Sequence, residues 1–139
     1  MVGPDKDNSL AKYIAYAQDL GLTVTFTGKL QKEEWIKRSK DFDIFINTTH
    51  FDNTPVSVIE AMALGMPIVS TNVGGIPFLV IDNSSGLLVN DNDVEGMVNA
   101  IKLLFKHKEL EKELIINARK TAENFDWNVV KYNWFEILK

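Results

Sequence analysis

A helix expected to begin near Pro55 carries the residues best suited to chemistry. The first backbone amides of an α-helix have no partner within the helix, and the helix dipole favours negative charge there. The amides of Val56 and Ser57 therefore suit a phosphate, and the Ser57 hydroxyl can add a further donor. Glu60 follows about one turn later, where its carboxylate can accept hydrogen bonds from two ribose hydroxyls. This pattern predicts a site for a phosphate-bearing ligand.

Each of these features also has an ordinary structural interpretation. Thr54 is a good N-cap and Pro55 suits a first helical turn, so the pair can simply start the helix. Gly74 and Gly75 are common turn residues. Glu60 stands in an otherwise apolar helix, where a buried unpaired charge is costly, so it faces solvent or has a purpose there. The residues alone leave both interpretations open.

Composition and missing motifs exclude several other chemistries. There is no cysteine, and the two histidines, His50 and His107, are far apart with no ligand at metal-binding spacing, so we expect no metal. The fingerprints of dinucleotide sites, P-loops and serine-hydrolase elbows are absent. A net charge of −4 and a pI near 5.1 argue against nucleic acid as a partner. Lysines between residues 102 and 112 alternate with glutamates, which is typical of a solvated helix face.

Strands are expected to alternate with helices along the chain. Apolar, β-branched runs predict strands at residues 22–27, 43–46, 67–70 and 86–89. Helical spacing predicts a polar helix around Trp35 and further helices near residues 10–20, 56–64, 93–105, 109–124 and 126–138. Gly21 and Gly65 suit the positions just after two of these helices. This order predicts an α/β fold, a Rossmann-like doubly wound parallel sheet.

Four strands are fewer than the five or six of a usual doubly wound sheet. We therefore expect residues 1–139 to form a single, truncated domain that lacks its first strand or strands. The sequence has no apolar run of about 18 residues and no signal-peptide pattern. We interpret the protein as cytoplasmic.

Loops that follow the expected strands are longer than those that precede them. The following loops lie at residues 28–30, 47–54 and 71–75, whereas the turns at residues 20–21 and 65–66 are short. In an open parallel sheet, ligands bind outside the carboxyl ends of the strands. The ligand is therefore expected at this edge.

The segment from Asp52 to Gly75, DNTPVSVIEAMALGMPIVSTNVGG, resembles the core of the retaining GT-B glycosyltransferases of family 4, the glycosyl transferases group 1. The resemblance extends through VTFTG at residues 24–28, DIFI at 43–46 and GLLV at 86–89, in the family's order. It implies the C-terminal domain of a GT-B enzyme, which binds a nucleoside-diphosphate sugar. It also implies hexosyl transfer without a metal or other cofactor.

The resemblance implies roles for single residues. Two acids separated by seven residues mark the family's donor site: Glu60 is the second and holds the ribose hydroxyls, while Asp52 stands where the first is usually glutamate. Asp52 keeps the charge with a shorter reach and is the candidate catalytic residue. Phe78 is a second departure, because relatives often carry an acid there. The implied donor-binding residues are Gly28 near the base, Gly74 and Gly75 where the backbone approaches the donor, and Asn53, Thr54, Pro55, Val56, Ser57 and Glu60.

The resemblance also implies partners. These are a UDP- or GDP-sugar donor, a glycan or lipid-linked acceptor in surface polysaccharide synthesis, and an N-terminal domain. That domain supplies the acceptor site, and a basic pair upstream of this chain neutralises the donor diphosphate. Without them the chain is expected to have little or no transferase activity. The full-length protein is expected in the cytoplasm, with peripheral attachment to the inner membrane face as one option.

The last expected helix is unusually aromatic. We expect most of its rings to pack on the domain's own core, although in the family this helix crosses back towards the N-terminal domain. Those rings belong to Phe125, Trp127, Tyr132, Trp134 and Phe135.

Two alternative functions stay open. One is a non-catalytic nucleotide- or partner-binding module on the same fold, favoured by Asp52 and Phe78. The other is a sugar-nucleotide epimerase, whose acidic and histidine pattern is not seen here.

Overall fold

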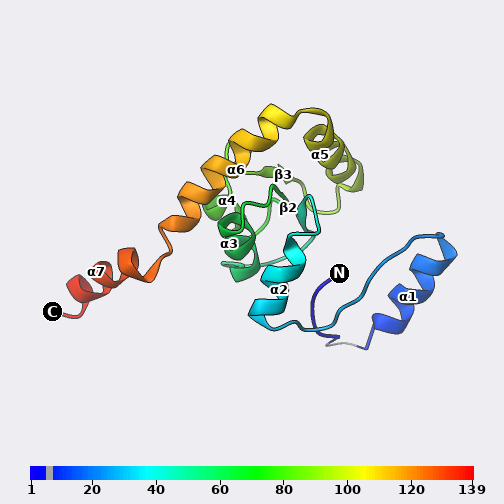
Figure 1. Ribbon diagram of the computed structural model, residues 1–139, viewed down its shortest axis with the longest axis horizontal. Coiled ribbons are helices and arrows are strands. Elements are labelled where there is room, and N and C mark those ends of the chain that lie inside the picture. Colours follow the sequence, from blue (N-terminus) through cyan, green and yellow to red (C-terminus); the bar gives the residue numbers. More distant parts are fainter. Residues whose placement is uncertain (6–7) are drawn as a thin grey trace. The chain divides into compact units, whose positions relative to one another are not determined.

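The computed structural model describes residues 1–5 and 8–139 (Figure 1). Its contacts divide the chain into two compact units, Met1–Lys40 and Asp41–Lys139, and each has its own architecture. The expectation of a single domain stays a prediction.

The first unit contains α1 (Leu10–Asp19) and α2 (Lys32–Ser39). Residues 22–27, expected as a strand, form none. This segment lies beside the start of the chain: the Met1 amino group donates to the Thr25 carbonyl at 2.6 Å, the Thr27 amide to the Met1 carbonyl at 3.1 Å, and the Gly3 amide to the Gly28 carbonyl at 3.0 Å. A strand needs a continuing ladder on a partner. Three hydrogen bonds to so short a partner do not supply one.

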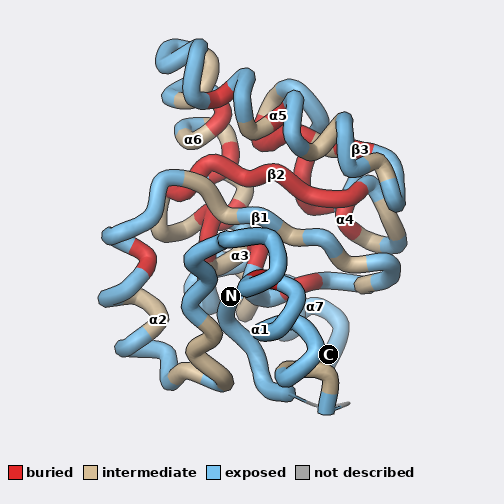
Figure 2. Tube along the Cα trace, turned by 90° about the vertical axis from the view of Figure 1, so that its right-hand side faces the viewer, coloured by how far each residue is buried: buried red, intermediate tan, exposed pale blue. Residues whose placement is uncertain are grey.

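A three-stranded parallel sheet forms the centre of the second unit. Its strands are β1 (Phe45–Asn47), β2 (Ile68–Thr71) and β3 (Leu87–Val89), in the order β1-β2-β3. All three lie within two residues of the expected ranges, because buried runs of apolar and β-branched residues are typical of parallel strands. Every residue of β2 is buried (Figure 2). The predicted α/β class with a parallel sheet is confirmed.

Five helices accompany the sheet: α3 (Val56–Ala63), α4 (Ile76–Leu79), α5 (Val94–Lys106), α6 (Lys108–Glu123) and α7 (Trp127–Ile137). The four long ones were expected, with α5 capped by Asp93, whose carboxylate accepts from the Gly96 amide at 2.7 Å. The short helix α4 was not. The expected N-cap at Thr54 is wrong, because Pro55 has extended backbone angles and is itself the residue before the first helical turn of α3.

Two faces of the sheet are covered by different helices. Val69, Leu87 and Val89 cluster with Leu104 of α5 and Leu114 of α6. Side chains alternate along a strand, so the neighbours of these residues project from the opposite face. Helix α3 packs against β1 and β2, and α5 packs against β2 and β3, on opposite sides of the sheet in Figures 1 and 2. This is the doubly wound arrangement predicted from the sequence.

Helix α7 extends beyond α6, away from the sheet (Figure 1). No residue of α7 is buried, and Trp127, Tyr132, Trp134 and Phe135 are each more than half exposed. The expectation that these rings pack on the domain's own core is therefore wrong. A sequence shows that a helix is apolar, but it does not show which surface covers it.

Candidate functional site

The carboxyl ends of β1, β2 and β3 meet at one edge of the sheet, because the three strands are parallel. Side-chain hydrogen bonds join the first two strands at this edge. The Asn47 side-chain amide donates to the Ser70 hydroxyl at 3.2 Å. The Thr71 hydroxyl, on a residue only 5% exposed, donates to the Thr49 carbonyl at 2.5 Å. The loop after β1 is thus tied to the end of β2.

Replacing Thr71 by valine is expected to destabilise the chain by about 0.5–1.5 kcal/mol, because the Thr49 carbonyl loses its hydroxyl donor while the shape of the side chain is kept. Thermal unfolding followed by circular dichroism measures the effect. Thr48→Val, at an exposed position in the same loop, is the matched control and is expected to change the unfolding temperature little. Equal effects of the two substitutions would contradict the assigned hydrogen bond.

The Gly74–Gly75 turn after β2 lies directly against the backbone of Asp52 and Asn53. The Gly75 amide donates to the Asp52 carbonyl at 2.7 Å. A Cβ atom on Gly74 would overlap the Asp52 carbonyl oxygen, and one on Gly75 would overlap the Asn53 carbonyl oxygen. These glycines therefore allow a close approach of the chain to itself, beside the candidate catalytic residue.

The amino end of α3 opens onto the same edge. Val56 and Ser57 are exposed, and within the described part of the chain neither amide donates a hydrogen bond. Pro55, the residue immediately before them, is buried and has extended backbone angles. Glu60 lies half-buried about one turn further along α3. The structure thus presents two exposed donors at the positive end of a helix, with a carboxylate close behind.

A histidine and an aspartate that are far apart in the sequence form a contact at this edge. The Nδ1 atom of His50, after β1, lies 2.6 Å from the Oδ1 atom of Asp91, after β3. This pair was not predicted from the sequence, because the two residues are 41 positions apart. Both side chains are partly exposed, so the pair contributes little to stability. The pattern in the sequence that could have predicted this pair is that each residue follows the end of an expected strand.

The predicted site residues are only partly brought together. Asp52, Asn53, Gly74 and Gly75 are in contact through their backbones. Thr54 and Pro55 lead from this contact into α3. Gly28 belongs to the unit Met1–Lys40, and its place near the base of a nucleotide stays a prediction.

Two shallow hollows lie at the opposite edge, beside the amino ends of the strands. One is formed where α5 joins α6, around Leu103, His107 and Leu110. The other lies between the end of α3 and α6 and is lined by Gly65 and Ile116. Neither contains a predicted site residue. The residues described form no cluster of three or more metal-binding side chains, and the expectation of metal-independent chemistry stays a prediction.

Residues 1–121 match the sequence profile of the family described as Glycosyl transferases group 1. The chain belongs to this family. A sulfoquinovosyl transferase from Arabidopsis thaliana is 31% identical to this group 1 chain over 120 residues, which make up 81% of the chain and 24% of that relative. A D-inositol 3-phosphate glycosyltransferase from Saccharomonospora viridis is 34% identical over 85 residues, 61% of the chain and 20% of the relative.

Solved structures share the fold of this group 1 glycosyltransferase chain. Sucrose-phosphate synthase from Thermosynechococcus elongatus superposes with a TM-score of 0.87 and 25% identity, over 99% of the chain and 36% of the synthase. Anabaena HepE, solved in complex with UDP-glucose, gives a TM-score of 0.86 and 22% identity, over 99% of the chain and 39% of HepE. The predicted GT-B fold is confirmed. The chain spans well under half the length of these relatives. None of the helices described is long and apolar enough to cross a membrane.

Proposed function

We propose that this chain binds the nucleoside diphosphate of a sugar donor at the carboxyl edge of its sheet, for a retaining hexosyl transfer. The observation that carries the proposal is the amino end of α3, where the exposed amides of Val56 and Ser57 are followed one turn later by Glu60. The amides and the helix dipole suit the diphosphate. The Glu60 carboxylate suits the paired hydroxyls of a ribose.

The same geometry accounts for the chemistry that we propose. When the bond from the anomeric carbon to the diphosphate breaks, negative charge grows on the leaving phosphate, and fixed amide donors stabilise that charge without reorganising. Asp52 lies where the Gly74–Gly75 turn holds its backbone, and we place its carboxylate beside the donor sugar. No metal or other cofactor enters this proposal.

The relatives support a nucleotide donor and leave its identity to experiment. HepE, which shares the fold, was solved with UDP-glucose, and we propose UDP, with GDP as the second candidate. The named relatives act on different substrates. A glycan or lipid-linked acceptor in surface polysaccharide synthesis, and a cytoplasmic site for the reaction, are therefore our proposals.

Transfer is proposed to need more protein than residues 1–139. The relatives are about two and a half to four times longer than the matched region, since it covers 24–39% of the first relative and the two solved structures. We propose that a partner domain supplies cations for the diphosphate and the acceptor site. The exposed aromatic rings of α7 offer it an apolar surface.

Nucleotide binding is tested by ligand-observed NMR on this chain with UDP, GDP, ADP and their sugar conjugates. One nucleotide is expected to bind in preference to the others, and its sugar conjugate is expected to compete with it. Binding of all three without preference, or of none at millimolar concentration, would contradict a nucleotide-sugar site on this chain.

The rival function is a non-catalytic nucleotide- or partner-binding module on the same fold, favoured by aspartate at position 52 and Phe78 at the usual place of an acid. Replacing Asp52 by asparagine in the longer protein separates the two. If Asp52 acts at the donor sugar, we expect transfer to fall by about 10²-fold or more, as for a transition-state contact, while UDP affinity changes little. Undiminished turnover would remove Asp52 from the mechanism, and no turnover in the unmodified protein would favour the rival.

A further inference from the structure

Gly75 has a backbone conformation that any residue can adopt. Its φ is −87° and its ψ is −6°, in the right-handed helical region. Gly74 beside it has a φ of +53°, which favours glycine whatever the surroundings. The backbone conformation therefore explains why glycine is required at position 74, but it does not explain the glycine at position 75.

Steric exclusion of a Cβ atom explains the glycine at position 75 instead. A Cβ atom at this position would overlap the Asn53 carbonyl oxygen and lie 2.5 Å from the carbonyl carbon and 3.1 Å from the Cα atom of the same residue. All three are backbone atoms, so no side chain can rotate away. Any residue other than glycine must push the loop after β1 out of its place.

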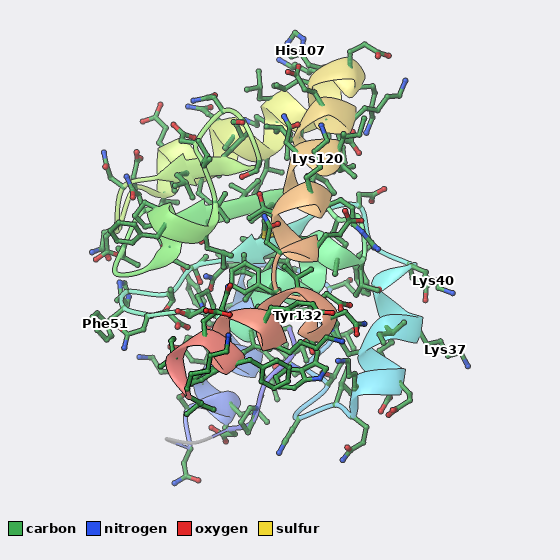
Figure 3. The ribbon with its side chains drawn as sticks, turned by 90° about the vertical axis from the view of Figure 1, so that its left-hand side faces the viewer. Lys37, Lys40, Phe51, His107, Lys120 and Tyr132 are labelled. Atoms are coloured by element: carbon green, nitrogen blue, oxygen red, sulfur yellow. The ribbon has the colours of Figure 1, made fainter. Side chains whose placement is uncertain are left out.

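The displaced loop is the one that carries the proposed site. The Gly75 amide donates to the Asp52 carbonyl at 2.7 Å, and Asn53 is followed two residues later by Pro55, from which α3 begins. Phe51, before Asp52, is exposed and projects outward from this loop in Figure 3, so it offers the loop little support of its own. Together with Gly74 and the Thr71–Thr49 hydrogen bond, the close contact at Gly75 holds this loop in place.

We propose that Gly75 is a positioning residue of the nucleotide site. Because Gly75 lacks a Cβ atom, the backbone of Asp52 and Asn53 can pack directly against the turn after β2. This contact positions Asp52 and the amides of Val56 and Ser57 to bind the same ligand. This inference rests on the proposed function. It adds that the site is built by contact between two loops and not by α3 alone.

The test compares Gly75→Ala with Gly65→Ala in ¹⁵N-labelled chain. Gly65 lies after the other end of α3 with a φ of +75°, and its Cβ atom would meet only Ile115 Cγ2 at 3.8 Å, so alanine there strains the backbone without moving the loop after β1. Gly75→Ala is expected to shift the amide resonances of residues 51–54, 56 and 57 and to weaken UDP binding about 10-fold or more, because catalytic and binding geometry tolerates little displacement. Gly65→Ala is expected to lower the unfolding temperature and leave both unchanged.

Each contrary result has a separate meaning. Resonance shifts confined to residues next to position 75, or unchanged UDP affinity with shifted loop resonances, would overturn the positioning role. Failure of the unmodified chain to bind UDP or another nucleotide would instead overturn the proposed function. The ligand-free spectra of the two variants would still show whether the loop after β1 packs against Gly75. If Gly75→Ala does not fold, hydrogen exchange in the unmodified chain decides: slow exchange at the Gly75 amide supports the contact, and exchange as fast as at the Val56 amide overturns it.

Discussion

Replacing Glu60 by glutamine is expected to weaken UDP binding by about 10-fold. The carboxylate of Glu60 is proposed to accept hydrogen bonds from both ribose hydroxyls, and glutamine keeps the shape but only one acceptor. A hydrogen bond to a charged group contributes about 1.5–3 kcal/mol, and about 1.4 kcal/mol is 10-fold in affinity. Isothermal titration calorimetry with UDP measures the change.

Glu113→Gln provides the matched control for this prediction. Glu113 is exposed on α6, and its replacement makes the same change in net charge at a distance from the amino end of α3. It is expected to leave UDP affinity unchanged. A loss of affinity shared by both variants would mean that net charge, and not a ribose contact at Glu60, governs binding.

Replacing Leu104 by alanine is expected to destabilise the chain by about 2–5 kcal/mol, the range for leucine truncated in a closed core. Leu104 is fully buried in the cluster that joins α5 to Val69 of β2 and Leu87 of β3. The cavity would lie under the strands whose carboxyl ends form the proposed site. Chemical denaturation measures the change in the free energy of unfolding.

Leu103→Ala is the control on the same helix. Leu103 is the preceding residue of α5 and is 36% exposed, whereas Leu104 is fully buried, so truncating Leu103 removes less buried surface. A destabilisation of well under 2 kcal/mol is expected there. If Leu103→Ala were as costly as Leu104→Ala, the face of α5 that packs on the sheet would be assigned wrongly.

The sequence was most informative where local pattern and burial agree. The strands at β1, β2 and β3 are apolar and β-branched, and the long helices α5 and α6 have clear periodicity, so their positions were predicted to within two residues. Helix α4 was missed because its four residues are too few to show a period. The segment 22–27 has strand composition, but strand formation depends on a partner that composition does not reveal.

The candidate site was likewise predicted only in part from the sequence. Glu60, Ser57 and Asp52 were found because they are close in sequence and lie within one recognisable segment. The contact of Gly75 with Asp52 and the pairing of His50 with Asp91 depend on which strands are neighbours and on their register. The exposure of α7 depends on surfaces beyond its own sequence, and its rings were assigned to the wrong environment for that reason.

Binding of the donor nucleotide at the carboxyl edge of the sheet is tested most directly by titrating ¹⁵N-labelled chain with UDP and following the amide resonances residue by residue. We expect the largest changes on the amides of Val56 and Ser57, on Glu60 and on residues 47–54, at that edge. Changes confined to the hollows beside α6, around Leu110 or Ile116, or no change at millimolar UDP, would contradict the claim that this edge holds the donor nucleotide.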